Sequence, residues 1–116
     1  MNDKIEKFED LIVWQKASIF SFNIYEIFKY LKDFSFKDQI QRAAVSIMNN
    51  IAEGYERKGN REYSRFLFIA KGSCGEVRSM LHLALKLKYI SEKDYLLLNK
   101  QAIEISKMLY GLIKKL

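Results

Sequence analysis

The spacing of the apolar residues predicts four amphipathic helices. Along the first stretch, apolar side chains recur three or four residues apart, as they do on one face of a helix. The same period returns in three later stretches, and a sustained two-residue alternation, which would indicate strands, occurs nowhere. The predicted core positions are Val13, Ala17, Phe20, Ile24, Ile27 and Leu31; Phe36, Ile40, Ala43, Ala44, Ile47 and Ile51; Tyr63, Phe66, Ala70, Cys74, Val77, Leu81 and Ala84; Leu98, Ala102, Ile105, Leu109, Leu112 and Leu116.

Residues with capping chemistry stand between these stretches. Ser35 and Ser91 each precede an aspartate by three residues, which is typical of the first turn of a helix. Gly59 suits a helix C-terminus, and Asn60 suits the N-cap of the next helix. The pattern therefore predicts helices over about 11–32, 36–56, 60–88 and 92–115.

The connections between these helices are short, so consecutive helices must run antiparallel. The predicted fold class is all-α, an antiparallel up-down-up-down four-helix bundle. A length of 116 residues allows one domain of this kind, which we expect to span residues 1–116. The complete absence of proline agrees with long uninterrupted helices.

The composition excludes several classes of site. Cys74 is the only cysteine and His82 the only histidine, so neither a disulfide framework nor a multi-histidine metal site can form. Nucleotide-binding glycine loops, zinc-protease motifs and nucleophile elbows are also missing. We expect Cys74 to be a small buried apolar side chain and His82 to lie on the surface. The chain is accordingly expected to be no enzyme and to need no cofactor or metal.

The N-terminal residues 1–7 carry charges of both signs and no apolar segment, so we expect no signal peptide. No stretch approaches the roughly 18 apolar residues that a membrane-spanning helix needs. We therefore expect a cytoplasmic protein.

The net charge of +6 is confined to one part of the chain. Residues 57–88 hold eight basic and two acidic residues, whereas the rest of the chain holds twelve of each. A basic stripe opposite the core of the third helix is typical of a phosphate-binding surface, although a merely solvated face has the same composition. The candidate nucleic-acid-binding residues are Arg57, Lys58, Arg61, Arg65, Lys71, Arg78 and Lys86.

Apolar side chains remain after the core is assigned. Ile19, Phe22 and Tyr30 form such a surplus on the first helix, and a second stripe runs along the third helix. Such stripes indicate either a wide core face or an interface between copies of the chain. Glycines inside the third helix would let another backbone approach, or they are tolerated weak spots. The candidate oligomer-interface residues are Ile69, Met80, Leu83, Leu87, Gly72 and Gly75.

The second predicted helix carries a strip of polar residues. Its members stand four residues apart in pairs, so they can hydrogen-bond along one face. A buried polar group of this kind can fix the register of a bundle, and a functional polar pocket is the alternative. Glu53 could also pair with Arg57. The strip consists of Arg42, Ser46, Asn49, Asn50 and Glu53.

Three blocks of the chain resemble one small bacterial family. They are FEDLIVWQKA at 8–17, QIQRAAVSI at 39–47 followed by NIAEG at 50–54, and FLFIAKGS at 66–73 followed by Glu76. These blocks resemble the four helix bundle protein family, also called the 23S rRNA-intervening-sequence or S23 family. Members often carry a proline where this chain has Met48.

The resemblance implies an assembly rather than a reaction. Some members of the family are encoded inside insertions in large-subunit ribosomal RNA genes. The family is similar to the accessory protein of diversity-generating retroelements, a pentameric barrel that binds nucleic acid and a reverse transcriptase. The resemblance therefore implies a homopentamer with a basic exterior or channel, no catalytic residues, and packing or assembly roles for Trp14, Asn50, Glu53 and Gly54.

Two functions follow from these observations. The first is a non-enzymatic oligomeric bundle that binds RNA or DNA through the basic surface of the third helix. The second is a protein–protein adaptor whose apolar stripes and basic face dock a nucleic-acid-processing enzyme.

Overall fold

The computed structural model describes residues 4–116, and within that range it contains helices and no strand. Of the charged N-terminal stretch, residues 1–3 lie outside the described residues. The predicted all-α class is confirmed. The elements are a 3-10 turn η1 (Phe8–Asp10) and the helices α1 (Ile12–Phe28), α2 (Phe34–Glu56), α3 (Asn60–Lys86) and α4 (Glu92–Lys114).

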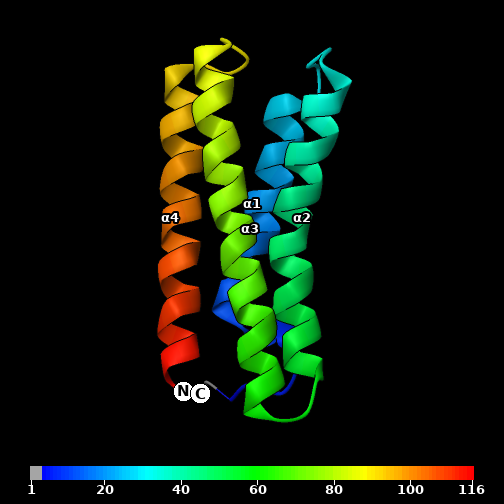
Figure 1. Cartoon of the computed structure of the whole chain (residues 1–116), viewed down its shortest axis with the longest axis vertical. Coiled ribbons are helices and arrows are strands. Elements are labelled where there is room, and N and C mark those ends of the chain that lie inside the picture. The colour runs from blue at the N-terminus through cyan, green and yellow to red at the C-terminus, as the bar shows by residue number, and fades with distance from the viewer. Residues whose placement is uncertain (1–3) are drawn as a thin grey trace.

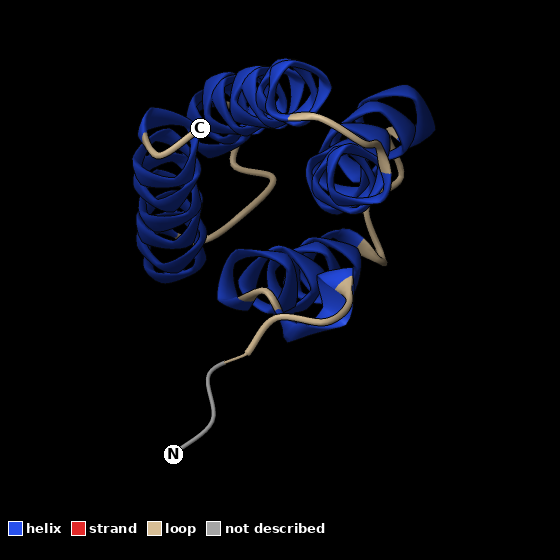
Figure 2. Cartoon of the chain, turned by 90° about the horizontal axis from the view of Figure 1, so that it is seen from below, coloured by secondary structure: helices blue, strands red, loops and turns tan. Residues whose placement is uncertain are grey.

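The four helices form an elongated bundle of 42 × 29 × 20 Å in which consecutive helices run antiparallel (Figure 1). Each helix packs against two others, so that α1 closes the bundle by contacting both α2 and α4. Figure 2 looks along the bundle and shows the helices around a shared centre. The predicted up-down-up-down order therefore holds. None of the helices in the described range is long and apolar enough to cross a membrane.

The apolar seams predicted from the spacing form most of the core. All six predicted positions of α2 are buried, as are the first four of the six predicted for α4. The core also buries Phe28, Leu67 and Ile90, which fall outside the seams. Leu116 was expected in the core and is exposed, because α4 ends at Lys114.

Two predicted N-cap residues are one or two positions off, although the predicted start of the third helix at residue 60 is confirmed. α2 begins at Phe34, and its N-cap is Asp33 rather than Ser35; the Asp33 Oδ1 accepts the backbone N–H of Phe36 at 3.1 Å. α3 has Gly59 as its N-cap residue, and Asn60 is already helical. The predicted cap at Ser91 is confirmed, since its Oγ accepts the N–H of Asp94 at 3.1 Å.

Two predicted helix ends extend too far. α1 stops at Phe28, not near residue 32. α3 stops at Lys86, not Lys88, because Lys88 adopts a left-handed backbone with φ +61°. The N–H of Tyr89 then donates to the carbonyl of Ala84 at 2.9 Å and closes the helix end.

Candidate nucleic-acid interface

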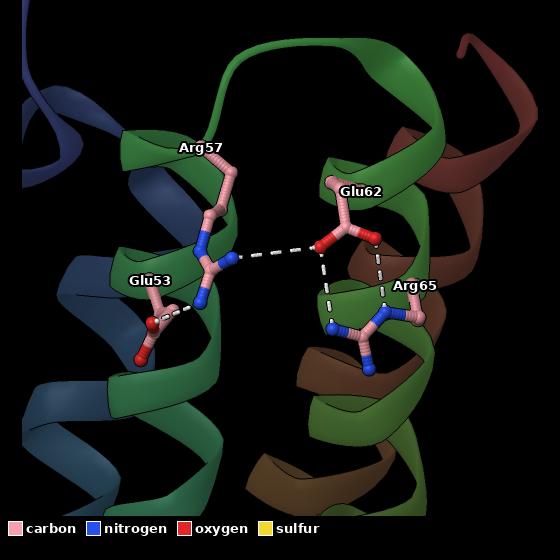
Figure 3. A network of polar contacts seen from close by, with 4 residues as sticks. All are labelled: Glu53, Arg57, Glu62 and Arg65. Atoms are coloured by element: carbon pink, nitrogen blue, oxygen red, sulfur yellow. Dashed lines mark hydrogen bonds and ion pairs between the residues drawn. The ribbon is translucent and has the colours of Figure 1, made fainter.

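Two arginines beside the α2–α3 connection, Arg57 and Arg65, form ion pairs with carboxylates. Arg57 Nη2 lies 2.9 Å from Glu53 Oε2, which confirms the predicted pair, and its Nη1 lies 3.7 Å from Glu62 Oε1. Arg65 donates two hydrogen bonds to Glu62, at 3.1 and 3.2 Å. Figure 3 shows how Glu62 stands between the two arginines and links the ends of α2 and α3.

The ring of Phe66 packs against the same two arginines. The guanidinium carbons of Arg57 and Arg65 lie 5.0 and 4.6 Å from the centre of its ring, within range of a cation–π contact. The Arg65 hydrogen bonds hold the pKa of Glu62 below its usual value, so this carboxylate stays ionised beside the cations. Two of the predicted phosphate-binding arginines are therefore already paired within the chain.

Lys58 and Arg61 lie beside this network and take no part in its ion pairs. Both side chains are exposed, and no ion pair joins either of them to another residue of the described range. The turn that carries them needs Gly59, whose φ of +97° is rarely adopted by residues with side chains.

Further along α3 the predicted cations turn toward α4. Lys71 and Arg78 are half-buried rather than pointing straight out, and Arg78 Nε donates to Asn99 Oδ1 at 3.5 Å. Lys86 is exposed in the last turn of α3. The predicted site is thus divided into a cluster at the α2–α3 end and a row along the α3–α4 side.

The acidic residues of α3 face away from that row. Glu62 faces Arg57, and Glu76 accepts a hydrogen bond from Gln39 of α2 at 3.5 Å. Both acidic side chains therefore lie on the α2 side of α3, which leaves the α4 side with positive charge alone.

The second apolar stripe of α3 is mostly exposed, as an interface between copies would require. Ile69, Leu83 and Leu87 expose between 41% and 48% of their surface. Met80 differs, because it is half-buried and packs against the core. A Cβ added at Gly72 or at Gly75 would meet no atom within 4 Å, so both glycines face open space. On α1 the surplus residues Ile19, Phe22 and Tyr30 are also exposed.

The polar strip of α2 contacts α3 at one place. Asn50 Nδ2 donates to the carbonyl and the Oγ of Ser46, at 2.8 and 3.0 Å, and Ser46 Oγ lies 2.9 Å from Ser73 Oγ. Arg42 pairs with Asp38 at 2.8 Å instead of with Ser46. Ser46 and Asn50 thus link the strip to α3, and all five members of the strip also line a shallow hollow of about 440 Å³.

The two residues with reactive side chains lie as the sequence predicts. Cys74 is fully buried, and burial raises the pKa of its thiol to about 12. His82 is exposed and its Nδ1 lies 3.2 Å from the hydroxyl of Tyr95 on α4. Within residues 4–116, no group of three His, Cys, Asp or Glu side chains is placed to hold a metal.

Lysines of α4 were missed by the count of charges along the chain. Lys93, Lys100, Lys107 and Lys114 are all exposed. The count failed because acidic residues on other faces offset them in the sum. Their seven-residue spacing is the signal that could have found them, since residues seven apart lie on one side of a helix.

The chain is thus an antiparallel four-helix bundle with cations along the outer side of α3 and α4. It belongs to the family of 23S rRNA-intervening sequence proteins, whose family model matches residues 9–111. The resemblance of the three sequence blocks is thereby confirmed.

Among solved structures, the chain is similar to a protein of unknown function from the S23 ribosomal protein family of Bacteroides thetaiotaomicron VPI-5482. The two are 30% identical and superpose with a TM-score of 0.85, over 89% of this chain and 99% of the other. No curated protein matches the chain.

Proposed function

We propose that this protein binds RNA or DNA through phosphate contacts made by the basic residues of 57–88, without catalysing a reaction. One observation carries the proposal: both acidic residues of α3 face α2, while its cations remain exposed or face α4. Lysine and arginine that neutralise phosphates release counterions, so such binding is strong at low salt and indifferent to sequence. A partner of this kind is found in the cytoplasm, where we place the protein.

Binding to a structured RNA hairpin at two salt concentrations tests the proposal. A triple variant, Arg61→Glu, Arg65→Glu and Arg78→Glu, reverses three charges of the proposed surface. The matched control, Lys29→Glu, Lys32→Glu and Arg42→Glu, reverses two exposed charges in the α1–α2 connection and one on α2. We expect only the first variant to lose binding, and equal binding by both variants would refute the surface.

A second candidate function is a protein–protein adaptor, which the exposed apolar stripes favour. Ile69, Leu83 and Leu87 on α3 are far more exposed than apolar side chains in a core.

We propose that copies of the chain associate through this stripe, with a pentamer as the assembly that the family resemblance implies. Sedimentation of the wild type and of Leu83→Asp decides this: a monomer in both cases contradicts the assembly and leaves the stripe for another protein.

A further inference from the structure

The contacts between α3 and α4 fix which residues of the two antiparallel helices stand side by side. His82 contacts Tyr95 at 3.2 Å, and Arg78 contacts Asn99 at 3.5 Å. Lys71 shares the lining of a shallow hollow of about 330 Å³ with Ser106, Lys107 and Tyr110. A residue that lies a given number of positions before His82 on α3 therefore stands beside the residue that lies about the same number of positions after Tyr95 on α4.

The lysines of α4 form a straight row along its outer side. They occupy positions 93, 100, 107 and 114, and two full helical turns take about seven residues. Successive lysines are about 10 Å apart along the axis, and the whole row is about 31 Å long. All four are exposed, and no ion pair joins them to a described acidic residue.

The matched register brings the lysine row alongside the cations of α3. Lys107 and Lys71 line the same hollow. Lys100 follows Asn99, the partner of Arg78. Lys93 in the first turn of α4 and Lys86 in the last turn of α3 flank the short connection between the helices. The α3–α4 face thus carries two parallel rows of positive charge.

Within the described residues, none of the acidic side chains of α4 forms an ion pair with the cations of these rows. Glu104 faces α1, where its Oε1 lies 3.5 Å from Lys16 Nζ. Glu92 and Asp94 stand in the first turn of α4, near one end of the row. The positive potential of neighbouring cations therefore adds up along most of the face, which favours a partner with regularly repeated negative charge.

We propose that the α3–α4 face binds the backbone of double-stranded nucleic acid over about one helical turn. This inference rests on the proposed nucleic-acid binding and specifies its substrate. A row of about 31 Å corresponds to roughly one turn of a duplex, which is about 34 Å. Lysine is a point charge without the fork that reads base edges, so the contact is to phosphates and independent of sequence.

A single strand fits this face less well. Proteins that bind single strands stack successive bases on aromatic side chains. Phe68 on α3 and Tyr110 on α4 are exposed. The Nζ of Lys114 lies 5.5 Å from the centre of the Tyr110 ring, so one face of this ring is already in contact with a cation. Two rings cannot stack a run of successive bases, whereas a straight row of cations suits a straight duplex.

The test compares a 22-base-pair duplex with either of its single strands in fluorescence-anisotropy titrations from 50 to 200 mM KCl. The double variant Lys100→Gln and Lys107→Gln removes two charges from the middle of the row. Loss of two phosphate contacts should lower the affinity for the duplex and reduce the salt slope by about 2. The fall in affinity between 50 and 200 mM KCl should then be about tenfold smaller than for the wild type. The control, Lys29→Gln and Lys32→Gln, removes two exposed charges from the end of α1 and the connection to α2 and should bind as the wild type does.

Each remaining outcome has a definite meaning. Unchanged duplex binding by Lys100→Gln and Lys107→Gln, with loss of binding by Arg61→Glu, overturns the α4 row and leaves the proposed function standing. Equal or tighter binding of the single strand overturns the duplex as substrate. Displacement of the duplex by polyglutamate at equal charge concentration would indicate an acidic protein partner instead. Absence of binding to every nucleic acid refutes the proposed function itself.

Discussion

Gly54 shows how a single residue sets the distance between two helices. A Cβ built at this position would lie 2.8 Å from Phe66 Cβ and 3.3 Å from the carbonyl oxygen of Tyr63, both on α3. These atoms cannot move without shifting α3 itself. Glycine at this position therefore permits the close approach of α2 to α3, which also allows the contact between Ser46 and Ser73.

Replacing Gly54 by alanine should destabilise the protein. The new methyl group forces the helices apart, and overpacking of this kind costs about 1–3 kcal/mol. The higher helix propensity of alanine returns at most about 1 kcal/mol of that loss. Urea unfolding should therefore show a lower free energy of unfolding for Gly54→Ala.

The matched control is Gly75→Ala, where a Cβ meets open space. This change should raise the free energy of unfolding by up to about 1 kcal/mol, through propensity alone. Stabilisation by both variants would show that α2 and α3 are not held together as closely as the structure places them.

Cys74 makes the stability of the bundle sensitive to high pH. Its thiol is fully buried and its pKa is raised to about 12, compared with about 8.5 in an unfolded chain. The buried thiol contributes fully to the free energy of unfolding below pH 8.5. This contribution is lost as the pH rises toward 12, because only the unfolded state then releases the thiol proton. The loss should amount to about 1.4 kcal/mol per pH unit within this window.

Unfolding by urea from pH 7 to 10 measures this effect as a difference between wild type and Cys74→Ala. Tyrosines and lysines titrate in both proteins, so their contributions cancel in the comparison. The wild type should lose more stability than the variant above pH 8.5, and parallel curves would contradict burial of the thiol.

At the scale of helices, the sequence predicted the interiors better than the ends. Helix interiors follow from the apolar period, which is repeated many times, whereas an end depends on one or two side chains. Asp33 and Ser35 are both good N-cap residues by type. Asp33 caps α2 because it also accepts a hydrogen bond from the Tyr89 hydroxyl at 2.7 Å, a contact between segments 56 residues apart. These hydrogen bonds lower the pKa of Asp33, and no local pattern reveals them.

Lys88 offers a way to strengthen the end of α3. Its left-handed backbone costs a residue with a side chain about 1–2 kcal/mol, and glycine avoids most of that cost. Lys88→Gly should therefore raise the free energy of unfolding by about 1 kcal/mol. Lys86→Gly, the same replacement two residues earlier inside the helix, should lower it by a similar amount, up to about 1 kcal/mol. Thermal melts of both variants measure the opposite shifts.

At the scale of the whole molecule, the sum of charges along the chain predicted only part of the candidate binding surface. The excess at residues 57–88 was located correctly, since a run of basic residues on one helix needs no tertiary information. Which of those cations are available was only partly predictable. The Glu53–Arg57 pair follows from its four-residue spacing, whereas the contact of Arg57 with Glu62 needs α2 and α3 side by side. The lysines of α4 were hidden in the same sum by acidic residues elsewhere in the chain. One of these is Glu104, which in the structure contacts Lys16 of α1.

Glu62 should therefore weaken nucleic-acid binding, although it lies within the most basic segment. Its carboxylate holds Arg65 by two hydrogen bonds and lies 3.7 Å from Arg57, so a phosphate must displace it to reach either cation (Figure 3). Glu62→Gln removes that competitor and leaves the fold almost unchanged, because exposed ion pairs contribute about 0–1 kcal/mol. We expect tighter binding of the RNA hairpin at 100 mM salt, by severalfold.

The control must separate local competition from net charge. Glu104→Gln changes the total charge by the same amount but breaks the pair with Lys16 and leaves the contacts of Arg57 and Arg65 with Glu62 intact. If the Arg57–Arg65 cluster contacts phosphate, Glu62→Gln should gain clearly more affinity than Glu104→Gln at the same salt concentration. Equal gains would mean that binding responds only to the overall field of the protein, in which case no particular set of arginines constitutes the site.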